Sequence, residues 1–235
     1  MRKYLFLAYP ICLYVVFSLS VVPLFALFYT CGIDLIIANS LGTLGMTLTY
    51  LFGKRKKTEG LTAVPWRSIF LLTGTMALPV VLLSLLLTIK AFGSIDLTTY
   101  LINCTWSFFC ISLCEELLFR EFLTVRMKTA KMPNFLILLL PALLFSLCHR
   151  PESVSFLLQR FILGTLLGYL YQKGGLALCV AVHWMYDIII YTFHTTLPYV
   201  TTCYSAARAA LHATLCLLSL FIMVVVYCLN KSKFA

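Results

Sequence analysis

The residues best suited to chemistry begin with two adjacent carboxylates and an arginine, Glu115, Glu116 and Arg120, inside a strongly apolar stretch. Residues four apart share one face of an α-helix, so Glu116 and Arg120 are expected to form an ion pair. Glu115 is turned about 100° from Glu116 at 3.6 residues per turn, which lets it point elsewhere, into a helix bundle. The two carboxylates then have different environments, which separates an acid–base role for Glu115 from a structural role for Glu116. The alternative is a helix end that dips into the cytoplasm with its acids solvated.

Two histidines follow further along the chain. His149 ends the segment Phe145–His149 beside Pro151, and the fixed φ of proline favours the start of a new helix there. His183 and Asp187 are four residues apart, so Asp187 can accept a hydrogen bond from one imidazole nitrogen and direct the other toward the bundle interior. A histidine oriented in this way serves catalysis or metal binding. The alternatives are an interfacial position for His149 and a purely structural polar pair for His183 and Asp187.

The composition requires lipid as the solvent for most of the chain, because 62% of the 235 residues are hydrophobic and only 11% are charged. A soluble domain is about 25% charged, and a membrane-spanning helix needs about 20 apolar residues. The apolar runs are continuous, which argues against the alternating pattern of a membrane barrel. The sequence therefore predicts an all-α membrane protein, a polytopic bundle of about eight transmembrane helices. They lie approximately at residues 4–29, 33–52, 68–89, 100–125, 134–149, 153–172, 174–193 and 209–229.

Positive charge is concentrated at the ends of alternate segments, most densely at Lys54–Lys57. With eight helices, all the basic clusters fall on one side, which the positive-inside rule assigns to the cytoplasm together with both termini. Topology and attraction to anionic lipid then explain the net charge of +10, and nucleic acid is not expected as a partner. Residues 1–99 are interpreted as three scaffold helices, residues 100–193 as a catalytic core, and residues 209–235 as the last helix with a cytoplasmic tail.

The ionisable groups gather in the fourth to seventh helices at similar depths. A charged side chain at membrane depth costs at least about 2.5–3.5 kcal/mol, so such groups are functional candidates by default. At 1.5 Å per residue, Glu115 lies about 15 Å above the cytoplasmic end of its helix, and His183 about 14 Å above the start of the seventh. His149 comes out at about 22 Å above the start of the fifth, which helix tilt can reduce. We therefore expect one polar cavity near the bilayer midplane, lined by Glu115, His149, His183 and Asp187.

Taken in order, three patterns resemble those of the CPBP intramembrane peptidases, the CAAX protease and bacteriocin-processing (Abi) family. They are EExxxR at Glu115–Arg120, FxxxH at Phe145–His149 and HxxxD at His183–Asp187. Each pattern is weak alone, whereas the three together on separate membrane helices are a strong signal. The stretch Phe161–Asp187 also resembles the penultimate segment of that family. The resemblance covers roughly residues 100–190 and leaves out the first three helices and the last.

The resemblance implies that Glu115 and His149 hold and activate the attacking water, while His183, with Asp187, stabilises the developing oxyanion. This is general-base chemistry with electrostatic stabilisation and without a covalent intermediate. The prenyl-protein endopeptidases of the family favour Asn where this chain has Asp187, which weakens the prenyl-substrate interpretation more than the peptidase interpretation. The residues that would hold the architecture in place are Glu116, Arg120 and Phe145.

Signatures of other intramembrane proteases are missing from the sequence, which contains no HExxH, GxSxG or GxGD pattern. No cofactor is expected. A zinc-dependent mechanism is kept as an alternative, because Glu115, His149, His183 and Asp187 are all plausible zinc ligands.

The leading hypothesis is an intramembrane endopeptidase that hydrolyses a peptide bond at or within the bilayer, in peptide maturation, bacteriocin self-immunity or membrane-protein cleavage. The alternatives are a non-enzymatic membrane immunity or regulatory protein of the same fold, and a proton-linked transporter. The expected partners are membrane lipid and a peptide or membrane-protein substrate, and the expected location is a bacterial cell membrane. The sequence does not indicate an oligomeric state. Within the bundle, Arg160 is interpreted as a counter-ion for Glu121.

Overall fold

The computed structural model describes residues 7–53, 64–83, 93–151, 154–200 and 205–234, and no β-strand occurs among them. The all-α prediction is confirmed for this part of the chain. Two helices, Leu97–Thr129 and Phe156–Leu197, are long and apolar enough to cross a membrane. Eight crossings, and the division of the chain at residues 99 and 193, stay predictions. The basic segment Lys54–Lys57 lies outside the described residues.

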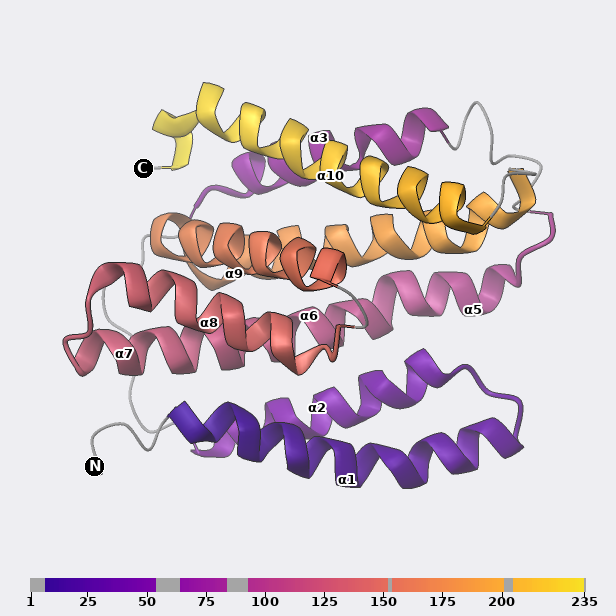
Figure 1. Cartoon of the computed structure of the whole chain (residues 1–235), viewed down its shortest axis with the longest axis horizontal. Helices are drawn as coiled ribbons and strands as arrows, with labels where there is room; N and C mark the ends of the chain where they lie inside the picture. The colour runs from indigo at the N-terminus through magenta and orange to yellow at the C-terminus, as the bar shows by residue number, and fades with distance from the viewer. Residues whose placement is uncertain (1–6, 54–63, 84–92, 152–153, 201–204, 235) are drawn as a thin grey trace. The chain divides into compact units, whose positions relative to one another are not determined.

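Each of the eight segments expected to be helical contains a helix (Figure 1). The elements in chain order are α1 (Tyr9–Thr30), α2 (Leu35–Gly53), α3 (Trp66–Leu83), α5 (Leu97–Ile102), η3 (Asn103–Ser107), α6 (Phe108–Glu116), η4 (Leu117–Thr124), α7 (Val125–Thr129), α8 (Asn134–Cys148), α9 (Val154–Val200), α10 (Ser205–Leu229) and η5 (Lys231–Phe234). The chain forms two compact units, each built from two separate stretches. Unit 1 comprises residues 1–63 and 109–180, and unit 2 comprises residues 64–108 and 181–235.

Unit 1 is organised around η4. The hairpin of α1 and α2 packs against η4, and so does α8, which returns along it after the turn that follows α7 (Figure 1). The Asp34 carboxylate accepts a hydrogen bond from the Ile36 N–H at 2.6 Å and so satisfies a free donor at the start of α2. Phe119, Leu123 and Phe145 are buried in the core of this unit.

The α9 segment is two helices joined at Gly175, whose φ of 74° and ψ of −169° are essentially accessible only to glycine. The Cys179 thiol contacts the Leu167 carbonyl at 3.1 Å. In a straight helix these residues would be about 18 Å apart along the axis. The chain therefore folds back on itself at Gly175, and the predicted boundary between the sixth and seventh helices, at residue 173, is correct within two residues.

Unit 2 pairs α3 with α10 along their lengths, and it pairs α5 and η3 with the second part of α9. Asp96 caps α5, because its carboxylate accepts from the N–H groups of Thr98 and Thr99. The Thr99 hydroxyl also donates to this carboxylate at 2.6 Å. These hydrogen bonds, that of the Thr99 side chain first, hold the pKa of Asp96 below its usual value.

Elements α5 to α7 run on as one helix, Leu97–Thr129, which is called the central helix below. Two of its stretches, η3 and η4, have π-helical geometry, which was not expected from the sequence. The wider register is visible in single bonds: the Phe108 N–H donates to the carbonyl of Asn103, and the Thr124 hydroxyl donates to that of Phe119. Both pairs are five residues apart rather than four. Such bulges re-aim side chains within a helix and are frequent at functional sites. Here η3 directly precedes α6 and η4 directly follows it, so they bracket the helix that carries Glu115.

Candidate active site

The first candidate pair lies in unit 1, where the structure brings Glu115 and His149 together. The His149 Nε2 atom is 3.6 Å from Glu115 Oε1, and the two side chains are 25% and 20% exposed. The other ring nitrogen, Nδ1, lies 2.7 Å from the Phe145 carbonyl oxygen. A carbonyl can only accept, so Nδ1 carries a proton and donates to it, and Nε2 is the ring nitrogen that faces Glu115. A partly exposed carboxylate and an oriented imidazole are suited to share a proton or a water molecule.

The short length of α8 brings His149 to this position. Its 15 residues span only about 22 Å, less than the roughly 30 Å thickness of the hydrocarbon core. His149 is the C-cap, and Arg150 follows with a positive φ of 47° that turns the chain away. A helix that ends early can present a terminal side chain inside a bundle, which is why His149 reaches Glu115.

Unit 1 also contains a fully buried ion pair, on the same helix as Glu115. Arg120 Nε is 3.1 Å from Glu116 Oε2, with both side chains 0% exposed, as the spacing of four residues predicts. The Arg120 guanidinium also donates to the Gly164 carbonyl at 3.1 Å. A Cβ atom on Gly164 would meet the backbone and side chain of Ala142 at 3.0 and 3.2 Å, so glycine permits the close approach of α9 to α8.

Phe145 connects the ion pair to the first candidate pair. The Arg120 guanidinium lies 5.2 Å from the centre of the Phe145 ring, a cation–π distance. The rings of Phe145 and His149 are 4.6 Å apart, and Phe119 packs edge-on against Phe145 at 5.6 Å. Phe145 therefore contacts the imidazole through both its backbone carbonyl and its ring, and its supporting role stays a prediction.

A second buried acid has a partner that the sequence analysis did not find. The Tyr171 hydroxyl donates to Glu121 Oε2 at 2.7 Å, and both residues are buried. Tyr171 lies in the sixth predicted helix, but nothing in its spacing distinguishes it from the other aromatic residues there. The interpretation of Arg160 as the counter-ion of Glu121 stays a prediction.

The second candidate pair lies in unit 2. His183 Nε2 is 3.7 Å from Asp187 Oδ2, and the side chains are 2% and 21% exposed. The helix turn between them is held by Trp184, whose indole N–H donates to the Cys104 carbonyl at 2.7 Å. The two candidate pairs belong to different compact units, so the single cavity lined by all four residues stays a prediction.

Comparison with known proteins bears on the segment that carries both pairs. Residues 97–189 match the family model described as type II CAAX prenyl endopeptidase Rce1-like. Residues 97–189 form an Rce1-like domain. This confirms the family to which the three sequence patterns were assigned, and it covers all four candidate residues. No curated protein and no solved structure shows a significant match to the chain.

The Rce1-like family is a membrane-embedded protease family, which indicates peptidase activity at the level of the family. The matched segment runs from α5 to the middle of the second part of α9, so it draws residues from both compact units. Helices α1, α2, α3 and α10 lie outside it.

A metal site is the remaining alternative from the sequence. Among the residues that the structure describes, no three His, Cys, Asp or Glu side chains converge in a way that could hold a metal ion. The contacts within the Rce1-like domain pair Glu115 with His149 in unit 1 and His183 with Asp187 in unit 2, and the zinc alternative stays a prediction.

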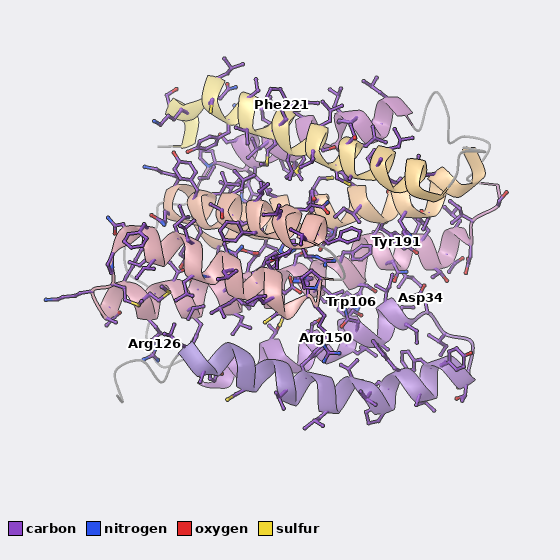
Figure 2. All side chains as sticks on the ribbon, viewed as in Figure 1. Asp34, Trp106, Arg126, Arg150, Tyr191 and Phe221 are labelled. Carbon is purple, nitrogen blue, oxygen red and sulfur yellow. The ribbon has the colours of Figure 1, made fainter. Side chains whose placement is uncertain are left out.

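A cavity of about 400 Å³ opens beside the residue that follows His149. Its wall is largely apolar and comes mainly from the hairpin of α1 and α2, outside the Rce1-like domain. Arg150 and Asn39 add polar groups to this wall, and Figure 2 shows Arg150 between α8 and α1. The other residues that line the cavity are Phe17, Val21, Val22, Phe25, Leu35 and Ile36.

Proposed function

We propose that this protein is an intramembrane endopeptidase in which Glu115 and His149 activate the water that attacks a peptide bond. The observation that carries the proposal is the 3.6 Å approach of His149 Nε2 to Glu115, with Nδ1 held by the Phe145 carbonyl. The Rce1-like match supports a CAAX-type protease at the level of the family.

In the proposed reaction, a water molecule sits between the Glu115 carboxylate and the His149 lone pair. One of these groups takes a proton as the water oxygen bonds to the carbonyl carbon, and the carbonyl oxygen becomes an oxyanion. The same proton is then available for the leaving amine as the C–N bond breaks. In the proposed step both ring nitrogens of His183 carry protons: one N–H faces Asp187, and the other donates to the oxyanion and so stabilises charge that appears only in the transition state.

The buried Glu116–Arg120 pair supports this assignment, because it removes one of two neighbouring carboxylates from the chemistry. Glu116 is fully buried against Arg120, whereas Glu115 is partly exposed and faces an imidazole. The cavity beside Arg150 suits an apolar group of the substrate, since most of its lining is aromatic or aliphatic. We further propose that both termini are cytoplasmic, that the protein lies in a bacterial cell membrane, and that it acts in peptide maturation, bacteriocin self-immunity or membrane-protein cleavage.

The test compares the peptide termini produced in membranes that carry the wild-type protein, Glu115→Gln or His149→Gln. A general base contributes about 10²–10⁴-fold to rate, so products present with the wild type should fall by at least about 100-fold in both variants. Asp34→Asn is the matched control, because this acid of unit 1 caps α2 and lies outside the proposed site. Identical peptide termini in wild-type and Glu115→Gln membranes would show that the protein is not a glutamate-dependent peptidase.

Repeating the assay with purified protein in detergent separates proteolysis from transport. No ion gradient exists across a micelle, so a proton-linked transporter would generate no Glu115-dependent fragments there. A non-enzymatic immunity or regulatory protein would generate none in either setting.

A further inference from the structure

Unit 2 contains a row of uncharged polar side chains between the central helix and the second part of α9. The hydroxyl groups of Tyr100 and Thr192 are 2.6 Å apart, and the Asn103 amide donates to the Tyr191 hydroxyl at 3.1 Å. The row begins close to Asp96, which is fully exposed and caps α5. It therefore extends from an exposed end of the unit toward its interior.

Two atoms in this row lack a hydrogen-bond partner within the described part of the chain. They are Asn103 Oδ1 and Ser107 Oγ, and both residues are 0% exposed. Other helical hydroxyls in unit 2 bond the carbonyl four residues back, as Thr105 does with Leu101 and Ser219 with Leu215. Ser107 lacks this bond, although Thr105 lies in the same π-helical stretch; the carbonyl four residues before Ser107, that of Asn103, accepts from the Phe108 N–H.

Leaving such atoms without a partner is unfavourable. A buried polar group with no hydrogen bond costs about 1–3 kcal/mol in a protein, and bulk water cannot reach it within the hydrocarbon region. An enclosed polar site of this kind favours a small molecule that can both donate and accept hydrogen bonds. Water fits, because buried waters typically bond to two to four polar groups.

The helix register places this site beside the second candidate pair. Tyr100 bonds Thr192 and the Cys104 carbonyl bonds Trp184, so residue numbers fall along α9 as they rise along the central helix. Ser107 is seven residues beyond Tyr100 and three beyond Cys104, which puts it level with residues 181–185 of α9, the turn that contains His183. Its hydroxyl lies at the interior end of the row.

We propose that Tyr100, Asn103 and Ser107 form a water-binding path that leads from the Asp96 end of unit 2 to His183 and Asp187. Asn103 Oδ1 and Ser107 Oγ are its interior binding sites, and the Tyr100 and Tyr191 hydroxyls continue it outward. Its use as a water supply for hydrolysis rests on the proposed function, whereas the binding of water does not. Each turnover of a peptidase consumes one water molecule, which a site enclosed by lipid must receive through the protein.

Thiol accessibility tests this path, because a small hydrophilic thiosulfonate reagent reacts with cysteines in contact with water and not with those facing lipid. Ser107→Cys changes a single atom, and Thr105→Cys is the matched control on the exposed face of the same segment. The full chain is labelled in membranes, and modification is read residue by residue by tandem mass spectrometry because ten native cysteines are present. We expect Ser107→Cys to be modified at least tenfold faster than Thr105→Cys. Equal or slower modification would overturn the proposal.

A blocking variant adds a second requirement. Asn103→Leu, combined with Ser107→Cys, replaces the polar side chain by an apolar one of similar size and should reduce modification to the level of Thr105→Cys. Unchanged modification would remove Asn103 from the path. Labelling does not depend on catalysis, so failure of the proposed peptidase activity would leave this result interpretable, and an active protein with an unlabelled Ser107→Cys would overturn the path alone.

Oxidation of tyrosine side chains in the wild-type chain tests the same path without any substitution. Hydroxyl radicals generated by radiolysis oxidise side chains next to bound water, including water inside proteins. Tyr191 should be oxidised several-fold faster than Tyr227, a buried tyrosine on α10. Figure 2 labels Tyr191 on the second part of α9. Equal oxidation of the two tyrosines would count against a hydrated path even if both cysteine variants failed to fold.

Discussion

The two compact units have interiors of opposite chemical character. Unit 1 buries an ion pair, Glu116 with Arg120, together with the acid Glu121. The interface of unit 2 between the central helix and α9 holds neutral groups, among them Tyr100, Asn103 and Thr192, and the same unit holds the His183–Asp187 pair. The proposed base therefore belongs to a unit with a buried ion pair. The proposed oxyanion-stabilising pair belongs to a unit with a neutral, hydrogen-bonded helix interface.

Within unit 1, the charge with a structural position, Arg120, and the charge proposed to react, Glu115, are held in different ways. Arg120 is held by a carboxylate, a carbonyl and two aromatic rings, so its position is strongly constrained. Glu115 is only partly buried and contacts a titratable histidine. Neutral hydrogen bonds between membrane helices are weak, about 0.6 kcal/mol on average, so the unit 2 interface is expected to tolerate change more readily.

The largest expected effect comes from breaking the buried ion pair. Glu116→Ala or Arg120→Ala leaves an unpaired buried charge and should lower the free energy of unfolding by about 3–5 kcal/mol. Asn103→Leu in unit 2 should cost about 0.6–1.7 kcal/mol, the range of single hydrogen bonds between membrane helices. Denaturant unfolding of the purified protein in detergent measures both, with exposed Thr105→Ala as the control. Equal losses in the two units would contradict the comparison.

A smaller effect is expected at Asp187, where the substitution chosen separates orientation from charge. Asn can still accept from the His183 ring, and its amide can also donate to an oxyanion, so Asp187→Asn should change the cleavage rate by less than about tenfold. Asp187→Leu removes the acceptor and should lower the rate by about 10–100-fold, as is typical when the group that orients a functional histidine is lost. Unchanged thermal unfolding of both variants is the control. If Asp187→Leu cleaves at the wild-type rate, Asp187 does not orient His183.

The smallest effect concerns the exposed cap of α5. The pKa of Asp96 is lowered in the folded protein, chiefly by the Thr99 hydroxyl, so its contribution to stability is complete above the unfolded pKa of about 3.9. That contribution is lost as the pH falls through the lower, folded pKa. Hydrogen exchange of the first turn of α5 should therefore accelerate only below about pH 4. Asp96→Asn keeps a good N-cap and should abolish this pH dependence, whereas acceleration near neutral pH would point to another group.

The sequence predicted those parts of the site that depend on local spacing. Glu116 with Arg120 and His183 with Asp187 meet because residues four apart share a helix face. The approach of His149 to Glu115 was expected from depth alone, although His149 had been placed higher than Glu115. The structure brings the two side chains to 3.6 Å, with α8 ending at Cys148, within one residue of the predicted end at residue 149.

Features that depend on tertiary contacts could not be read from the sequence. The π-helical register of η3 has no residue signature, and no spacing in the sequence indicates that the buried Ser107 hydroxyl lacks a partner in the described part of the chain. Tyr171 is paired with Glu121 only because the first part of α9 packs against the central helix. The cavity beside Arg150 is formed by the α1–α2 hairpin, which the sequence analysis treated as scaffold.

The interleaving of the two units limits how this protein can be divided. The matched segment, residues 97–189, begins inside unit 2, passes through unit 1 and ends inside unit 2 again. Expressed by itself, it would lack the α1–α2 hairpin that packs on η4 in one unit, and α3 and α10 in the other. The candidate side chains are therefore not a portable module. A recombination event or a truncation that kept only the matched segment would transfer these side chains without the helices that complete each unit.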